Sequence, residues 1–173
     1  HDSGGTLIPG TTNDDGGGGL DSLLEFTPAS SGRYFIAAGA FSTHTGTYTL
    51  EVQDLGAADD FSADTGTTGT AVVDGSVTGA IETGGDHDWF RVSLAAGTTY
   101  NIDLEGAPTG KGTLPDTLLY GLRDASGNLI AGTTNDDGGT GLNSHVEFTA
   151  TSSGIYFVDV GAYGANEGTY TLS

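Results

Sequence analysis

A long internal repeat dominates the sequence: residues 1–50 match residues 123–172 without a gap. About thirty of the fifty aligned positions are identical, far more than chance provides. The later copy continues upstream through about sixty further residues, to Asp59, whereas the sequence shows no such segment before His1. The sequence therefore contains one whole repeat and one half repeat, and tandem arrays of this kind are typical of modular binding, spacer or fibre proteins.

The net charge limits the kinds of partner. Asp and Glu number 23 against 4 Lys and Arg, giving a formal charge of −19, so nucleic acid is excluded as a partner and anionic membranes are repelled. Most of the acids are Asp among Gly, Asn, Ser and Thr, the residue types of turns and of Ca²⁺ ligands. The alternative interpretation is an acidic surface that keeps a protein soluble.

Cysteine and membrane-spanning segments are both absent from the sequence. With no Cys, neither a disulfide framework nor a thiolate metal site is available. No apolar run approaches the roughly 20 residues of a membrane span, so we expect no membrane insertion.

Short alternating apolar segments predict an all-β, antiparallel β-sandwich. In residues 89–94, for example, Phe90, Val92 and Leu94 alternate with Trp89, Arg91 and Ser93, which predicts a buried face and an exposed face. No stretch has helical apolar spacing, so we expect essentially no helix. The strands expected in the whole repeat are 76–81, 89–94, 99–104, 118–123, 128–132, 145–149, 155–160 and 168–172.

The half repeat keeps the last four of these strands, expected at 7–10, 23–27, 34–38 and 46–52. The predicted organisation is a half sandwich at 1–52, an acidic linker at 53–69, and the rest of a complete sandwich at 70–173, with the repeat beginning near residue 59. Four strands cannot close a sandwich alone. We therefore expect the half repeat to pack on an adjacent repeat or to be completed by strands of another copy.

The strongest candidate metal site joins the linker to the first strands. Asp59 and Asp60 precede Phe61, and Asp86 and Asp88 alternate about 25 residues later. Four carboxylates at one sheet end would repel one another without a cation, and Ca²⁺ prefers such oxygen ligands. The alternative is that Asp59 and Asp86 only cap turns.

At this point the sequence resembles the bacterial pre-peptidase C-terminal domain, a secreted β-sandwich module that accompanies proteases and collagenases. The resemblance spans residues 59–173 in full and 1–52 as a second half. It rests on the segments DDF, GDHDWFRVSLAAGTTY, LPDTLL, NLIAGTTNDDG, SGIYFVDVGA and GTYTL.

The resemblance implies a jelly-roll-like β-sandwich that is extracellular and non-catalytic. Such a module often binds calcium and in some members attaches an enzyme to an insoluble substrate. The family's calcium ligands would fall on Asp59, Asp60, Asp86 and Asp88. The fuller calcium-binding members have more linker Glu and Asn than this chain.

A second candidate metal site is the Asn-Asp-Asp-Gly segment that both copies contain. We take its residues as possible ligands, and the same residues also make a good turn. They are Asn135, Asp136 and Asp137, with Asp116 nearby, and Asn13, Asp14 and Asp15 in the half repeat.

Catalytic motifs are missing, since neither H-E-x-x-H nor G-x-S-x-G occurs, and we expect no enzyme. The first functional hypothesis is a calcium-associated structural or self-assembling module, which forms a fibre or surface array by strand complementation or repeat stacking. The second is a substrate-attachment module of a secreted protease or polysaccharide-degrading enzyme.

Overall fold

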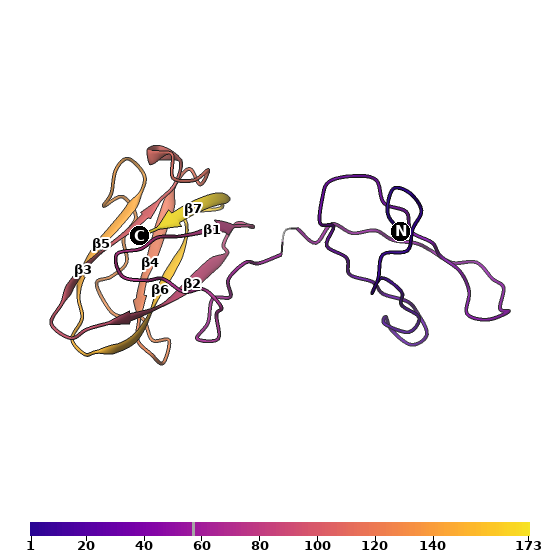
Figure 1. Cartoon of the computed structure of the whole chain (residues 1–173), viewed down its shortest axis with the longest axis horizontal. Helices are drawn as coiled ribbons and strands as arrows, with labels where there is room; N and C mark the ends of the chain where they lie inside the picture. The colour runs from indigo at the N-terminus through magenta and orange to yellow at the C-terminus, as the bar shows by residue number, and fades with distance from the viewer. Residues whose placement is uncertain (57) are drawn as a thin grey trace. The chain divides into compact units, whose positions relative to one another are not determined.

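A computed structural model describes all residues of the chain except residue 57. Its contacts divide the chain into two compact units, His1–Asp54 and Leu55–Ser173 (Figure 1). Each unit is described by itself below.

The unit Leu55–Ser173 is a two-layer antiparallel β-sandwich, which confirms the predicted fold class. One sheet has the strand order β1-β7-β3-β5, and the other has the order β2-β6-β4. A single 3₁₀ turn, Ala107–Thr109, is the one helical element in the described residues. The strands are β1 (Val77–Ile81), β2 (His87–Leu94), β3 (Thr99–Glu105), β4 (Thr117–Arg123), β5 (Ser144–Thr149), β6 (Gly154–Ala162) and β7 (Gly168–Leu172).

The pairing of these strands follows one rule. Each of the five ladders joins one of the first four strands to one of the last three. The ladders are β1·β7, β2·β6, β3·β5, β3·β7 and β4·β6. The first four strands come from residues 77–123 and the last three from residues 144–172. Each half of the repeat therefore depends on the other for its sheet hydrogen bonds.

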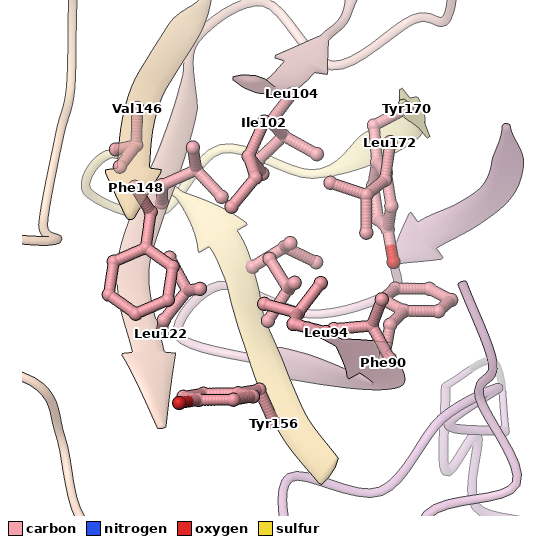
Figure 2. Packing of buried hydrophobic residues seen from close by; sticks show 14 of the residues in the cluster. Phe90, Leu94, Ile102, Leu104, Leu122, Val146, Phe148, Tyr156, Tyr170 and Leu172 are labelled. Carbon is pink, nitrogen blue, oxygen red and sulfur yellow. The ribbon is translucent and has the colours of Figure 1, made fainter. Parts of the chain in front are cut away.

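The core lies between the two sheets and is built by period-2 alternation. In β2, Phe90, Val92 and Leu94 are buried while Arg91 and Ser93 are exposed, as predicted. Figure 2 shows side chains of both sheets converging on this space, with Phe90 near Tyr170. Burial of these residues supplies the main stabilising term of the sandwich.

Trp89 departs from the predicted alternation. It shares the outer face of β2 with Arg91 and Ser93, yet it is only 7% exposed. The ring of Phe157 packs beside it, and the guanidinium carbon of Arg123 lies 4.5 Å from the centre of the Trp89 ring. This cover on the outer face turns an expected surface residue into a buried one.

The predicted strand at 128–132 is wrong, because that segment forms only an isolated bridge between Leu129 and Arg123. The Asp124 carboxylate accepts the amides of Ser126 and Asn128 and holds a turn there. Further on, the Thr133 hydroxyl accepts the amide of Leu122 and so takes the place of a ladder bond. Side-chain hydrogen bonds thus compete successfully with strand pairing in this segment.

The unit His1–Asp54, all of whose residues the structure describes, contains no strand and no helix. The strands predicted at 7–10, 23–27, 34–38 and 46–52 are therefore wrong for this chain. The pairing rule gives the physical reason: the counterparts of β5, β6 and β7 are present, but their partners are counterparts of β1–β4. Without a partner, strand ladders cannot form.

The predicted linker, 53–69, includes residue 57, which lies outside the described residues. From Asp59 onward the chain packs on the sandwich. The ring of Phe61 lies 4.8 Å from that of Phe90, and the Thr67 hydroxyl donates to the Trp89 carbonyl at 2.8 Å. Thr70 then forms a parallel bridge with Arg91. These contacts fix the carboxylates of Asp59 and Asp60 beside the sandwich.

Candidate metal sites

The first acidic cluster lies where β1 ends and β2 begins. Glu82 follows β1, Asp86 precedes β2, and Asp88 is the second residue of β2. One ligand oxygen each from Asp59, Asp60 and Asp88 lie within 4.8 Å of one another. The same holds for Asp59, Glu82 and Asp86, so Asp59 is common to both groups.

Asp88 is the most deeply buried acid of this cluster, with a relative exposure of 0%. Its Oδ2 accepts a hydrogen bond from the Tyr170 hydroxyl at 2.5 Å, while its buried Oδ1 has no hydrogen-bond partner. Desolvation by burial is the main cause that raises the pKa of Asp88 to about 8, and the charges of Asp60, Asp86 and Glu82 add to it. A buried carboxylate oxygen without a partner is costly, and a cation would remove that cost.

Glu82 and Asp60 have similar but weaker perturbations. Desolvation, followed by a hydrogen bond with Asp86, raises the pKa of Glu82 to about 7, and the buried Oε2 of Glu82 also has no partner. Desolvation raises the pKa of Asp60 as well, against the opposing effect of the Ala80 amide that donates to Asp60 Oδ2. The cluster therefore concentrates negative charge at a partly desolvated sheet end.

Turn capping explains part of this cluster. Asp59 Oδ1 accepts the amide of Phe61 at 2.9 Å, and Asp86 Oδ1 accepts the amide of His87 at 2.8 Å. These are the bonds that the alternative interpretation of the sequence requires. Capping does not account for Asp88, which lies within β2 and whose Oδ1 points to no donor.

The second acidic cluster brings together Asp116, Asp136 and Asp137, with ligand oxygens within 4.8 Å of one another. Asp116 directly precedes β4, and the other two lie in the loop before β5. Desolvation, followed by the neighbouring carboxylates, raises the pKa of both Asp116 and Asp136. Each of these two residues has a buried Oδ1 without a partner.

Asn135 does not belong to this cluster. Its Oδ1 accepts the amides of Gly138 and His145, so it closes the loop. Asn13 does the same in the half repeat, where its Oδ1 accepts the amides of Gly16 and Leu23. No group of three possible ligand side chains in the described residues includes Asp14 or Asp15. The counterpart of Asp116 lies in the part of the repeat that the first copy lacks.

His87 packs on the outer face of the sandwich. Its Nδ1 lies 3.0 Å from Asp159 Oδ1, and its ring stacks on that of Tyr120 at 3.7 Å. Arg123 binds the other oxygen of Asp159 through Nε and Nη2, both at 2.8 Å. These contacts make His87 part of a packed ionic network.

Two residues of the first cluster escaped the sequence reasoning. Glu82 lies four residues before Asp86, directly after the last apolar residue of β1, and an acid at that strand end was the available signal. Tyr170 was expected in the core and is there, but its hydroxyl also reaches Asp88 from β7. No spacing in the sequence predicts a contact across 82 residues.

Both clusters offer only oxygen donors, the ligand type of hard cations such as Ca²⁺. The first cluster combines five carboxylates, among them the fully buried Asp88, whereas the second has three carboxylates, none of them fully buried. The first is therefore the stronger candidate site.

Comparisons with known proteins found similarity to a family model and to a solved structure. Residues 86–162 match the family model described as the bacterial pre-peptidase C-terminal domain. Among solved structures, the chain is similar to the pre-peptidase C-terminal domain of a collagenase from Bacillus anthracis, at 22% identity and a TM-score of 0.42. That match covers 61% of this chain and 91% of the other. No curated protein matches the chain.

Proposed function

We propose, from the match of residues 86–162 to the family model of the bacterial pre-peptidase C-terminal domain, that the protein is a non-catalytic, calcium-binding module of a secreted modular protein. The observation that carries the calcium proposal is the fully buried Asp88 carboxylate, whose Oδ1 has no hydrogen-bond partner. A ligand oxygen of Asp88 lies within 4.8 Å of oxygens of Asp59 and Asp60. Calcium at this point ties the segment from Asp59 to the β1–β2 end of the sandwich. The ion thereby stiffens the entrance to each repeat.

An accessory role outside the cell is consistent with several features of the chain. The high negative charge and the absence of Cys fit a soluble module that does not rely on disulfides. No described helix has the length and apolarity of a membrane span. The His87 and Arg123 side chains both contact Asp159, and we assign none of these three residues a catalytic role.

A structural role is favoured over attachment to an insoluble substrate. Attachment modules present a strip of exposed aromatic rings, and within the described part of the sandwich Tyr163 is the exposed aromatic residue, at 55%. Trp89 is buried, and Tyr120 is stacked on His87. One exposed ring is a poor binding platform.

Thermal unfolding with and without calcium tests the proposal. Trp89 is the single tryptophan of the chain and is buried in the sandwich, so its fluorescence reports the unfolding of that unit. At a calcium concentration one hundred times Kd, mass action stabilises the folded unit by about 2.7 kcal/mol. We expect the melting temperature to fall by several degrees when a chelator replaces calcium.

Two isosteric variants locate the ion. Asp88→Asn removes a proposed ligand and should abolish the calcium response, whereas Asp136→Asn reports whether the second cluster contributes. Asp74→Asn removes the same charge outside both clusters and serves as the control. An unchanged melting temperature of the unmodified chain in chelator would contradict the calcium proposal.

A further inference from the structure

The half repeat exposes the apolar side chains that the complete repeat buries. Phe26 is 41% exposed while its counterpart Phe148 is 9% exposed, and Leu50 is 53% exposed while Leu172 is 3% exposed. The same contrast holds for Ile36, at 60%, whose counterpart Val158 is 3% exposed. Leu24 and Tyr48 follow the same pattern against Val146 and Tyr170. The face of the first copy formed by residues 23–50 is thus an uncovered sandwich core, called the acceptor face below.

The complete repeat shows what covers such a face. Residues 144–149 pair with β3. Residues 154–162 pair with β2 and β4, and residues 168–172 pair with β1 and β3. All of these covering strands come from the segment 77–123. The acceptor face therefore matches a segment with the strand pattern of residues 77–123.

One backbone pair of the missing sheet is already in place. In the complete repeat, Arg123 at the end of β4 is paired with Phe157 of β6. In the half repeat, the counterpart His1 exchanges both backbone bonds with Phe35, at 2.9 and 3.0 Å. His1 therefore occupies the position of the last residue of β4, in the same register.

We propose that the acceptor face binds a four-strand segment patterned like residues 59–122, which enters from the amino-terminal side of His1. Its last strand would run into His1 as β4 runs into Arg123. Its other strands would pair with residues 22–27, 32–40 and 46–50 in the registers seen for β5, β6 and β7. The result is a second complete sandwich, joined to the first by the acidic segment before Phe61.

A second copy of this chain is the wrong occupant, because the numbers of donors and acceptors do not match. Each chain carries one set of β1–β4 and two sets of their partners. A copy that lent its β1–β4 to the acceptor face of a neighbour would uncover its own residues 144–172. Any assembly of residues 1–173 alone thus leaves one uncovered face for every copy. The inference does not depend on calcium and goes beyond the function proposed above.

Extension of the chain tests the proposal directly. A second copy of residues 55–122 is fused in front of His1, and amide hydrogen exchange is followed by mass spectrometry in residues 22–27, 32–40 and 46–50. We expect exchange in these segments to slow by more than about 100-fold in the extended chain, approaching the protection of residues 144–172. The matched control carries Leu104→Asp in the added copy only, because Leu104 is fully buried and a charge there prevents its packing.

The possible results show which segment covers the acceptor face. Slow exchange in the extended chain, with fast exchange in both the control and the unextended chain, supports the proposal. Fast exchange in the extended chain overturns it. Protection of residues 22–50 in the unextended chain also overturns it. If that protection rises with concentration, a second copy is the occupant, and if it is independent of concentration in a monomer, the chain covers the face itself.

Discussion

Residues 1–50 and residues 123–172 have nearly the same sequence and very different secondary structure. The later copy supplies β5, β6 and β7 to a closed sandwich, and the first copy contains no strand. Their turns nevertheless agree. Ser22 donates to the Asp14 carbonyl at 2.7 Å, as Ser144 donates to the Asp136 carbonyl at 2.8 Å. The Thr11 and Thr133 hydroxyls likewise donate to the carbonyls three residues earlier, both at 2.7 Å.

This comparison separates local from long-range structure. Turns need only a Ser, Thr, Asn or Asp side chain and a few neighbouring residues, so both copies make them. Strands of this fold have no partner within their own half of the repeat, so the copy without the other half cannot make them. Matched residues therefore contribute differently to the free energy of unfolding in the two copies.

The largest expected difference in stability is between alanine variants of the two matched phenylalanines in the segment Glu-Phe-Thr, which both copies contain. Phe148→Ala removes a ring that packs against Tyr156 in the closed core, and we expect it to destabilise the sandwich by about 3–5 kcal/mol. Phe26→Ala removes a ring in the same local setting, beside Tyr34, but without a cover. We expect it to leave the urea midpoint reported by Trp89 fluorescence unchanged. Equal losses from both variants would show that the two copies form one cooperative unit and would break the comparison.

Alternation and turn residues in the sequence were sufficient to predict most of the sandwich. Seven of its eight predicted strands are present, because period-2 patterns such as Phe90, Val92 and Leu94 reflect burial directly. The segment 128–132 was wrong because the hydroxyl of Thr133 replaces a ladder bond, which no pattern of polarity reveals. The four strands of the half repeat were wrong because their periodicity is real but their partners are elsewhere.

The candidate site was predictable to a similar degree. The pairs Asp59 and Asp60, and Asp86 and Asp88, were identified from their spacing, and the fold brings ligand oxygens of all four into one cluster. Glu82 required knowledge of where β1 ends, and the bond from Tyr170 required the pairing of β1 with β7. Contacts between distant strands are set by topology, which a single sequence does not contain.

The pH dependence of stability should come from the complete copy alone. Asp88 has a pKa of about 8 in the folded chain, against an ordinary value near 4, so the folded state holds an extra proton between these values. In chelator, the stabilising effect is fully present below about pH 4 and is lost as the pH rises through about 8. We expect the free energy of unfolding to fall by on the order of 4 kcal/mol between pH 5 and pH 9.

The neutral variant Asp88→Asn tests the origin of this slope. Asn keeps an acceptor for the Tyr170 hydroxyl and cannot ionise, so urea midpoints measured through Trp89 should vary much less with pH. Asp74→Asn, outside the cluster, should keep the full slope. A slope that survives Asp88→Asn unchanged would assign the extra proton to another group, with Glu82 as the next candidate because its pKa is about 7.

The smallest expected difference in stability comes from removing one tyrosine hydroxyl at matched positions of the segment Gly-Thr-Tyr-Thr-Leu, which both copies contain. Tyr170→Phe leaves the ring packing intact and removes the donor to Asp88 Oδ2, so both oxygens of a buried carboxyl are then without a partner. We expect a loss of about 1–2 kcal/mol in chelator, measured as a shift of the urea midpoint. Tyr48, the counterpart, is 73% exposed, and Tyr48→Phe should change the midpoint by no more than about 0.5 kcal/mol.

Fusion of the added residues 55–122 before His1 sharpens this last comparison. The added segment supplies a counterpart of Asp88, which would face Tyr48 as Asp88 faces Tyr170 if the second sandwich closes. Tyr48→Phe in the extended chain should then lower the free energy of unfolding by as much as Tyr170→Phe does in the unextended chain. The cost is read from the hydrogen exchange of residues 46–50, which lie beside the new contact. If Tyr48→Phe remains neutral there, the two tyrosines are equivalent in sequence only, and the first copy closes with a different register from the second.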